Sequence, residues 1–324
     1  MFVPIGALIV DFVLTITISV AAGVSALIAY LPSLAPARIV LGLGLLVLVA
    51  GLTWFGRGGR LTFAVVFSFP VAMALATGTE APSTAIAQLG QLGPADRRRF
   101  ARGTLAATFV IVAGLTIGLA GLAVRLHVGI PGPDSTQIAD VAHAAAGSGS
   151  LYALFQAASA LLLLAAASSS FQAGPGLLKA LSRHPHSAGV GILPRAFGDT
   201  NRHHTPYWSV LVYLAVSAAV LIAAAGHEQE LVLFYAVAVF VSFLAGLAAM
   251  ARFSLRDHRP ALAAVNIADA AAVAFTLVVN LARGYPLLSI AATAAIAATL
   301  YALWARAGRP AGVEEVERHL RRPR

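Results

Sequence analysis

The chain has 324 residues, of which 59% are hydrophobic and 11% are charged, with a net charge of +9 and no cysteine. Soluble domains carry about 25% charged residues, so this composition excludes a soluble protein. The lack of cysteine excludes disulfides, thiolate nucleophiles and cysteine metal sites. Apolar stretches of about 20 residues, the length that a helix needs to cross a bilayer, recur throughout and predict an all-α, polytopic membrane protein.

The apolar segments follow one another closely, separated by short clusters of proline, glycine and arginine. They cover roughly residues 5–31, 37–56, 61–89, 104–126, 149–170, 207–225, 231–252, 262–282 and 285–305. We therefore expect about nine transmembrane helices in one membrane domain, residues 1–306, followed by a short basic tail, residues 307–324. A short amphipathic helix is expected at 171–183, where leucines lie opposite polar residues.

The basic residues lie mainly in the loops, which is the topogenic pattern of a membrane protein and argues against nucleic acid as a partner. Alternating the loops backward from a cytoplasmic C-terminus places three arginine-rich loops inside: 91–103, 171–206 and 253–261. The opposite loops, including 127–148 and 226–230, carry few basic residues. The pattern predicts a multi-pass protein of the cytoplasmic (inner) membrane with its C-terminus in the cytoplasm.

The segment at 61–89 breaks this pattern, because arginines flank it on both sides: Arg57 and Arg60 before it, and Arg97 to Arg102 after it. Both clusters favour the cytoplasm, yet only one apolar segment separates them. Three interpretations stay open. The segment is a re-entrant hairpin broken near Gly78–Pro82, or it spans once against a weak signal, or a helix has been lost from an ancestor with two.

Three acids lie inside apolar segments: Asp11, Glu80 and Asp269. No lysine or arginine lies deep in any segment, so an intramembrane acid would stay protonated or meet a cation. Asp11 and Thr15 are four residues apart and share a helix face. Thr77 and Glu80 are three apart, within a stretch interrupted by glycine and proline. Asp269 is near a segment end and is more typical of a hydrated interface.

No set of residues indicates an enzyme. The chain shows no serine–histidine–acid arrangement and no metal-ligand spacing, and the histidines of the 171–206 loop have no accompanying carboxylates. We therefore expect neither catalysis nor a cofactor.

Several strings of the sequence resemble one family in order. Asp11-Phe-Val-Leu-Thr15 resembles the third transmembrane helix of the amino acid–polyamine–organocation (APC) superfamily, closest to its KimA-like potassium importers and the amino acid permeases beside them. Ala76-Thr77-Gly-Thr-Glu80 resembles the sixth helix of that branch, and the region from Phe155 to Phe171 its eighth. The string at Leu193–Phe197 resembles the next cytoplasmic loop, and that at Leu233–Phe243, which includes Tyr235, the tenth helix.

This resemblance implies a LeuT-like fold and a proton-coupled secondary transporter. It implies that Asp11, Thr15, Thr77 and Glu80 take part in binding the ion or proton, and that Tyr235 lies in a helix lining the pathway. Membrane lipid and a small cation, proton or amino acid would be its partners. Whether the substrate is potassium, an amino acid or a polyamine is left open.

The chain departs from the family at its start, because counterparts of helices 1, 2 and 5 are absent. The expected fold is therefore an incomplete LeuT-like fold, and a central site built by paired broken helices would have only one member of the pair. An alternative is a truncated or degenerate permease relative that acts as a membrane partner without transport of its own. We expect poor transport by the chain alone, with an upstream-encoded chain supplying the missing helices; a homodimer is a further candidate assembly.

Overall fold

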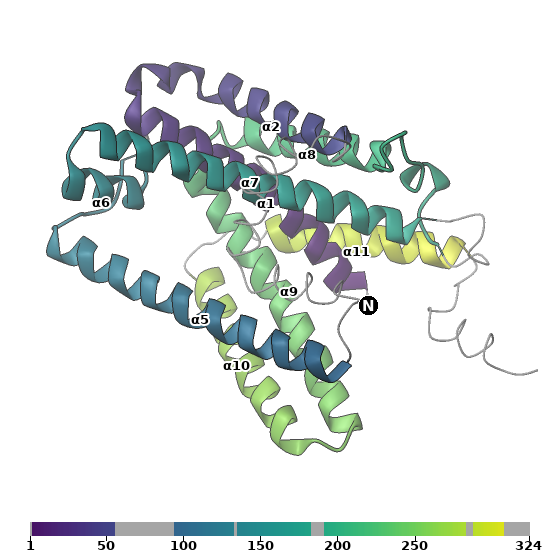
Figure 1. Ribbon diagram of the computed structural model, residues 1–324. Coiled ribbons are helices and arrows are strands. Elements are labelled where there is room, and N and C mark those ends of the chain that lie inside the picture. The colour runs from purple at the N-terminus through teal and green to yellow at the C-terminus, as the bar shows by residue number, and fades with distance from the viewer. Residues whose placement is uncertain (1, 56–93, 133–134, 183–190, 283–287, 308–324) are drawn as a thin grey trace, which may run out of the picture. The chain divides into compact units, whose positions relative to one another are not determined.

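The computed structural model describes residues 2–55, 94–132, 135–182, 191–282 and 288–307. Its regular elements are all helical, which confirms the expected all-α class for these residues. The α-helices are α1 (Phe2–Tyr30), α2 (Arg38–Trp54), α5 (Pro94–Arg125), α6 (Gln137–Ala146), α7 (Ser150–Leu181), α8 (Tyr207–Ala223), α9 (Glu228–Arg256), α10 (Pro260–Ala282) and α11 (Leu288–Arg306). Two short 3₁₀ helices, Pro32–Ala37 and Arg195–Phe197, precede α2 and α8 (Figure 1).

Six helical stretches in the described ranges are long and apolar enough to cross a membrane, namely Ile5–Tyr30, Pro32–Trp54, Arg99–Arg125, Ser150–Leu181, Glu228–Arg256 and Pro260–Val279. Two shorter apolar helices, Tyr207–Ala223 and Ile290–Arg306, accompany them. The chain is thus a multi-pass membrane protein. Each predicted apolar segment has a matching helix apart from 61–89, which lies outside the described residues together with Thr77 and Glu80.

The predicted loop at 127–148 contains a short helix, α6, which the sequence analysis did not indicate. Thr136 caps this helix by accepting a hydrogen bond from the backbone N–H of Ala139 at 3.2 Å. Gly147 ends it in a left-handed conformation with φ of 68°. Its ten residues are too few for a membrane span, and the search for apolar segments therefore passed over it.

The stretch expected to form a short amphipathic helix, 171–183, is helical to Leu181, but it is the end of α7 and not a short helix of its own. Pro175 lies inside α7, where it removes one backbone donor but does not end the helix. The apolar segment predicted at 149–170 is therefore the first two thirds of a longer helix.

The chain folds into two compact units. Unit 1 comprises Met1–Thr15, Phe171–Ser217 and Gln229–Arg324, and unit 2 comprises Ile16–Ser170 and Ala218–Glu228. The boundaries cut through α1, α7 and α8, and also separate the first residue of α9, Glu228, from the rest of that helix, so each of these four helices contributes to both units.

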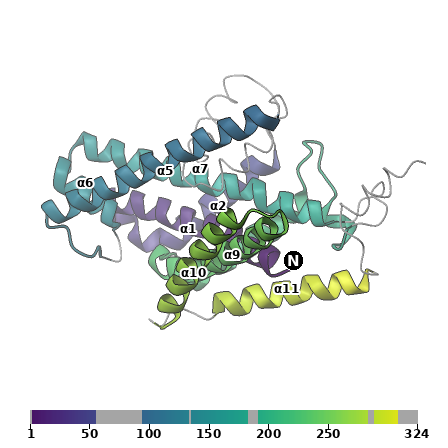
Figure 2. The same ribbon diagram turned by 90° about the horizontal axis from the view of Figure 1, so that it is seen from below.

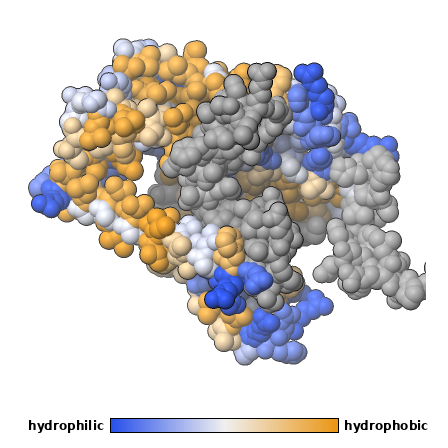
Figure 3. Space-filling view, viewed as in Figure 1, coloured by the Kyte–Doolittle hydropathy of each residue, from blue (hydrophilic) through white to orange (hydrophobic). Residues whose placement is uncertain are grey.

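In unit 2, the second half of α1 packs with α2 and the end of α8 around a buried apolar core that includes Val24, Leu46 and Leu221. Gly42 lies so close to Leu221 that an added Cβ would come within 2.7 Å of a leucine methyl carbon. Because the contact is so close, α2 and the end of α8 have little room to shift against each other. By contrast, only 6% of the apolar window of α5 is buried. Apolar side chains cover its middle, and hydrophilic ones gather at its ends (Figure 3).

In unit 1, α9 and α10 form an antiparallel helical hairpin (Figures 1 and 2), in which Asn266 Nδ2 donates to Ser254 Oγ at 3.2 Å. The first turn of α1 packs on the last turns of α11, where Phe2 contacts Tyr301 and Trp304 with ring centroids 5.9 and 5.7 Å apart. Aromatic clusters of this kind are typical of a membrane–water interface. The beginning of α1 and the end of α11 therefore lie at the same end of unit 1.

Candidate functional site

Asp11 and Thr15 lie one turn apart on α1, inside its apolar span. The Thr15 hydroxyl donates to Asp11 Oδ1 at 3.4 Å, and both side chains are partly exposed. The prediction that they share a helix face is confirmed. The bond is long, so the hydroxyl and the carboxylate hold each other loosely. Both keep oxygen lone pairs that can turn toward a third group.

Tyr213, on α8, is a residue that the sequence search missed. Its side chain is fully buried, and its hydroxyl oxygen has no hydrogen-bond partner among the described residues. The ring packs directly on Gly174 of α7, where an added Cβ would come within 2.6 Å of two ring carbons. Tyr213 also lies within electrostatic range of the Asp11 carboxylate. The buried hydroxyl therefore belongs to the same part of unit 1 as Asp11.

A signal for Tyr213 exists in the sequence. Ser209, Tyr213 and Ser217 recur every four residues, which places them on one face of α8. All three are at most 1% exposed. In an otherwise apolar span this face carries three hydroxyl groups, a pattern that the search for acids did not weigh.

The other predicted residues lie on other elements or outside the described residues. Tyr235 lies on α9 in unit 1 and is partly exposed, and its role stays a prediction. Thr77 and Glu80 fall outside the described residues. Asp269 is exposed on α10, as an interfacial residue would be. Among the described residues, no group of three or more histidine, aspartate or glutamate side chains could hold a metal ion.

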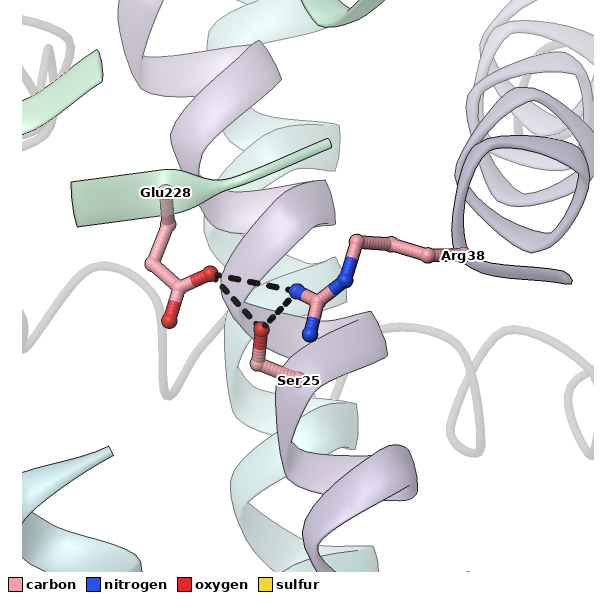
Figure 4. Close-up of polar contacts among 3 residues, drawn as sticks. All are labelled: Ser25, Arg38 and Glu228. Atoms are coloured by element: carbon pink, nitrogen blue, oxygen red, sulfur yellow. Dashed lines mark hydrogen bonds and ion pairs between the residues drawn. The ribbon is translucent and has the colours of Figure 1, made fainter. Parts of the chain in front are cut away.

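A second polar group, formed by Ser25, Arg38 and Glu228, is buried in unit 2; we call it the clasp (Figure 4). Arg38 Nη1 donates to Ser25 Oγ at 2.8 Å, and Ser25 Oγ donates to Glu228 Oε2 at 2.6 Å. The guanidinium nitrogen lies 3.8 Å from the same carboxylate oxygen. The Arg38 and Glu228 side chains are only 5% and 9% exposed. A serine hydroxyl thus links two opposite charges, acting as both acceptor and donor.

The turn between α8 and α9 packs on the Arg38 side chain of the clasp. Gly226 adopts a left-handed conformation with φ of 75°, and its N–H donates to the carbonyl of Leu221 at 2.9 Å to end α8. An added Cβ at Gly226 would meet the Arg38 Cγ at 2.9 Å, so the turn rests on the arginine stem. Glu228 begins α9, where a negative charge is favourable, and its carboxylate offsets Arg38 at the first position of α2.

The clasp could not be predicted from the sequence. Glu228 was expected in an outer loop and Arg38 at the edge of a segment, and Ser25 and Glu228 are 203 residues apart. The sequence analysis considered basic partners only for Asp11, Glu80 and Asp269, so it made no prediction for this pair. The two charges come together only because the turn after α8 returns the chain to the start of α2.

The two groups offer different chemistry. The clasp is neutral as a whole, because its single negative charge faces a single positive one. Asp11 lies beside neutral oxygens, the Thr15 hydroxyl and, at longer range, the Tyr213 hydroxyl. A carboxylate among hydroxyls inside a membrane can take up a proton or hold a small cation.

Comparison with known proteins supports a transporter relative. No protein-family model matches the chain. The chain is similar to the potassium transporter KimA of Bacillus subtilis (strain 168), with 28% identity over 289 residues. The match covers 74% of this chain and 45% of the relative, so the chain spans less than half the length of the protein that it resembles. The similarity is distant, and the named relative is a transporter, not an enzyme.

Proposed function

We propose that the chain is the helical core, or a part of it, of a proton-coupled secondary transporter that imports a small cation such as potassium. The observation that carries the proposal is the Asp11–Thr15 pair inside the apolar span of α1. The distant similarity to a potassium transporter supports the choice of cation.

The chemistry of the pair suits a weakly bound cation. Potassium is held in proteins by oxygen atoms that replace its hydration shell, and hydroxyl and carboxylate oxygens supply such ligands. A carboxylate at membrane depth also costs ~2.5–3.5 kcal/mol or more, and a bound cation or proton offsets that cost. Proton and cation would therefore compete for Asp11, which is a simple basis for coupling their movements.

Further residues would complete the site. The Tyr213 hydroxyl is buried and unsatisfied among the described residues, so it is available to donate to Asp11 or to accept a cation. We assign Tyr235 to the pathway on the strength of the family resemblance, and Thr77 and Glu80 on the same ground. An amino acid stays the alternative substrate, since the same superfamily resemblance includes amino acid permeases.

A second candidate function is a membrane partner with no transport of its own. On this reading, the chain binds a cation weakly but turns over only with further helices from another chain. A test of binding must therefore be separate from a test of uptake.

Binding is tested by the thermal stability of the purified chain in detergent, titrated with potassium chloride, with choline chloride at equal ionic strength as the control. We expect potassium to raise the melting temperature at neutral pH, and acid to weaken the effect because protons compete for the carboxylate. The same titration on Asp11→Asn should show no difference between potassium and choline. Equal stabilisation of wild type and Asp11→Asn would remove Asp11 from the site.

Uptake is tested by reconstituting the 324-residue chain in liposomes with an inward proton gradient and measuring rubidium entry. Proton-dependent rubidium entry by wild type, lost in Asp11→Asn, would support transport by the chain alone. Potassium binding without uptake would support the partner reading. Neither binding nor uptake of potassium, with entry of a labelled amino acid instead, would move the proposal to the permease alternative.

A further inference from the structure

A cavity at the end of α9, within unit 1, involves none of the residues of the proposed cation site. Its volume is about 550 Å³, and the described residues that line it all belong to α9: Ala248, Ala249, Arg252, Phe253 and Arg256. We propose that this cavity binds an anionic phospholipid, whose phosphate is held by the two arginines and whose acyl chain lies along the alanines and Phe253. The proposal does not depend on cation transport.

The residues that line the cavity share one face of α9. They form two rows with a spacing of four residues, which is the spacing of neighbours on a helix surface. The opposite face packs on α10, because Ser254 is buried and accepts a hydrogen bond from Asn266 Nδ2 at 3.2 Å. The two arginine side chains are exposed and lie on the face directed away from α10.

The two arginines are suited to one phosphate group. Arg252 and Arg256 are four residues apart, about 6 Å along the helix axis, so both guanidinium groups can reach the same anion. Neither makes a hydrogen bond or an ion pair with another residue that the structure describes. A guanidinium binds two phosphate oxygens at once through its planar fork. Arg259 adds a third positive charge at this end of the hairpin, against the single negative charge of Asp257.

The order of the residues along α9 favours a lipid over a soluble anion. Ala248 lies toward the middle of the apolar span and Arg256 at its end, about 12 Å further along the axis. Phe253, between them, is 58% exposed. A phospholipid has the same order, with acyl chains in the hydrocarbon and a phosphate at its boundary, whereas a soluble phosphate would use the arginines alone. The 253–261 loop is predicted on the cytoplasmic side, where anionic lipids give the membrane surface a negative potential.

The test is a titration of the melting temperature of the purified chain in a neutral detergent. The ligands are phosphatidylglycerol, phosphatidylcholine with the same acyl chains, and glycerol phosphate, which carries the charge without the chains. We expect phosphatidylglycerol to raise the melting temperature in a saturable manner, because it binds the folded chain. Phosphatidylcholine should give a smaller rise, and glycerol phosphate at the same concentration should give none.

The arginine variants test the charged half of the site. Arg252→Gln and Arg256→Gln should each raise the apparent Kd for phosphatidylglycerol about fivefold, and the double variant about thirtyfold. Arg259→Gln is the matched control, because it removes the same charge from a residue that is exposed but does not line the cavity. It should change the Kd by less than about twofold, since salt screens exposed charges that do not contact the ligand.

The apolar half of the site has its own matched pair. Phe253 and Leu255 are both 58% exposed, but only Phe253 lines the cavity. Phe253→Ala should raise the apparent Kd for phosphatidylglycerol about threefold to tenfold, because an apolar contact with the acyl chain is lost. Leu255→Ala should leave it unchanged.

Three results would overturn the proposal. The first is equal stabilisation of the wild type by phosphatidylglycerol and phosphatidylcholine, and the second is an unchanged affinity for phosphatidylglycerol in the double arginine variant. The third is an equal effect of glycerol phosphate, which would make the cavity a site for soluble phosphate compounds. All the substituted side chains are exposed, so the variants should fold. If the double variant nevertheless shows no cooperative melting, the single variants compared with Arg259→Gln decide the question.

Discussion

Unit 2 holds Glu228 against a guanidinium and a hydroxyl, whereas unit 1 holds Asp11 beside hydroxyl groups. Both acids belong to helices of a membrane protein, and both cost free energy if they are left charged in an apolar medium. The clasp meets this cost internally with a permanent positive charge. Two neighbours of Asp11, Thr15 and Tyr213, are neutral.

The two arrangements suit different roles: the clasp suits a structural role, and Asp11 suits ligand binding. A buried acid with a matching base is satisfied in one geometry, and removing either partner leaves an uncompensated charge. An acid among hydroxyls has two satisfactory states, one protonated and one with a bound cation. The first arrangement favours a fixed position, and the second favours exchange of ligands with the surroundings.

The largest expected contrast is in exposure to the two sides of the membrane. We expect a cysteine at Thr200 to face the cytoplasm and one at Ile130, which is 96% exposed, to face the exterior. An impermeant thiol reagent applied to intact cells should label the position-130 cysteine only, and disruption of the cells should make the position-200 cysteine reactive. Labelling of position 200 in intact cells would reverse the predicted orientation.

The second prediction concerns stability. Glu228→Ala leaves Arg38 buried without its charge partner, and such changes cost ~3–5 kcal/mol. Asp11→Asn removes a charge that lies within an apolar span beside the Thr15 hydroxyl, so we expect the free energy of unfolding to be unchanged or higher. Thermal denaturation in detergent, monitored by helix content, measures both.

The control for this contrast is Glu230→Ala, an exposed acid on the first turn of α9, which should change stability by less than ~0.5 kcal/mol. If Asp11→Asn proved as destabilising as Glu228→Ala, then both acids would be structural and the distinction between the two groups would be lost.

The third prediction tests how closely Tyr213 is seated. Gly174→Ala places a methyl group within 2.6 Å of the Tyr213 ring, so the ring or α7 must move at a cost of ~1–3 kcal/mol. Gly176→Ala, two residues along, meets nothing within 4 Å and should be neutral or stabilising by up to ~1 kcal/mol. The melting temperatures of the two variants give the comparison. Equal values would mean that the ring is not held against α7.

The sequence was sufficient for the architecture and insufficient for the contacts. Apolar length alone located every described membrane helix, because the thickness of a bilayer imposes that length. It did not indicate α6, which is too short to span, and it divided α7 into a membrane segment and a short amphipathic helix, although α7 runs unbroken to Leu181.

The residues of the candidate site also divide into those that the sequence predicts and those that it does not. A spacing of four residues was enough to pair Asp11 with Thr15, since both lie on one helix. The spacing also marks the hydroxyl face of α8, although an acid-based search does not look for it. No sequence spacing predicts the clasp, because its members come from three helices and are brought together by the turn at Gly226. Contacts set by tertiary packing cannot be derived from periodicity.

The smallest expected effect separates two roles for the Tyr213 hydroxyl. If the group is only a packing residue, Tyr213→Phe removes a buried oxygen without a described partner and should stabilise the protein by ~1 kcal/mol, with no other change. If the hydroxyl serves Asp11, the same variant should still gain stability but lose cation affinity by about threefold to tenfold.

Potassium-dependent melting of wild type and Tyr213→Phe, compared at one pH, measures both quantities in one experiment. A gain in stability together with a loss of potassium response is the outcome expected for a site residue, because a group kept at a cost to folding must be retained for another reason. A gain in stability with an unchanged potassium response would show that Tyr213 serves only the packing between α7 and α8. The proposed site would then consist of Asp11 and Thr15 without Tyr213.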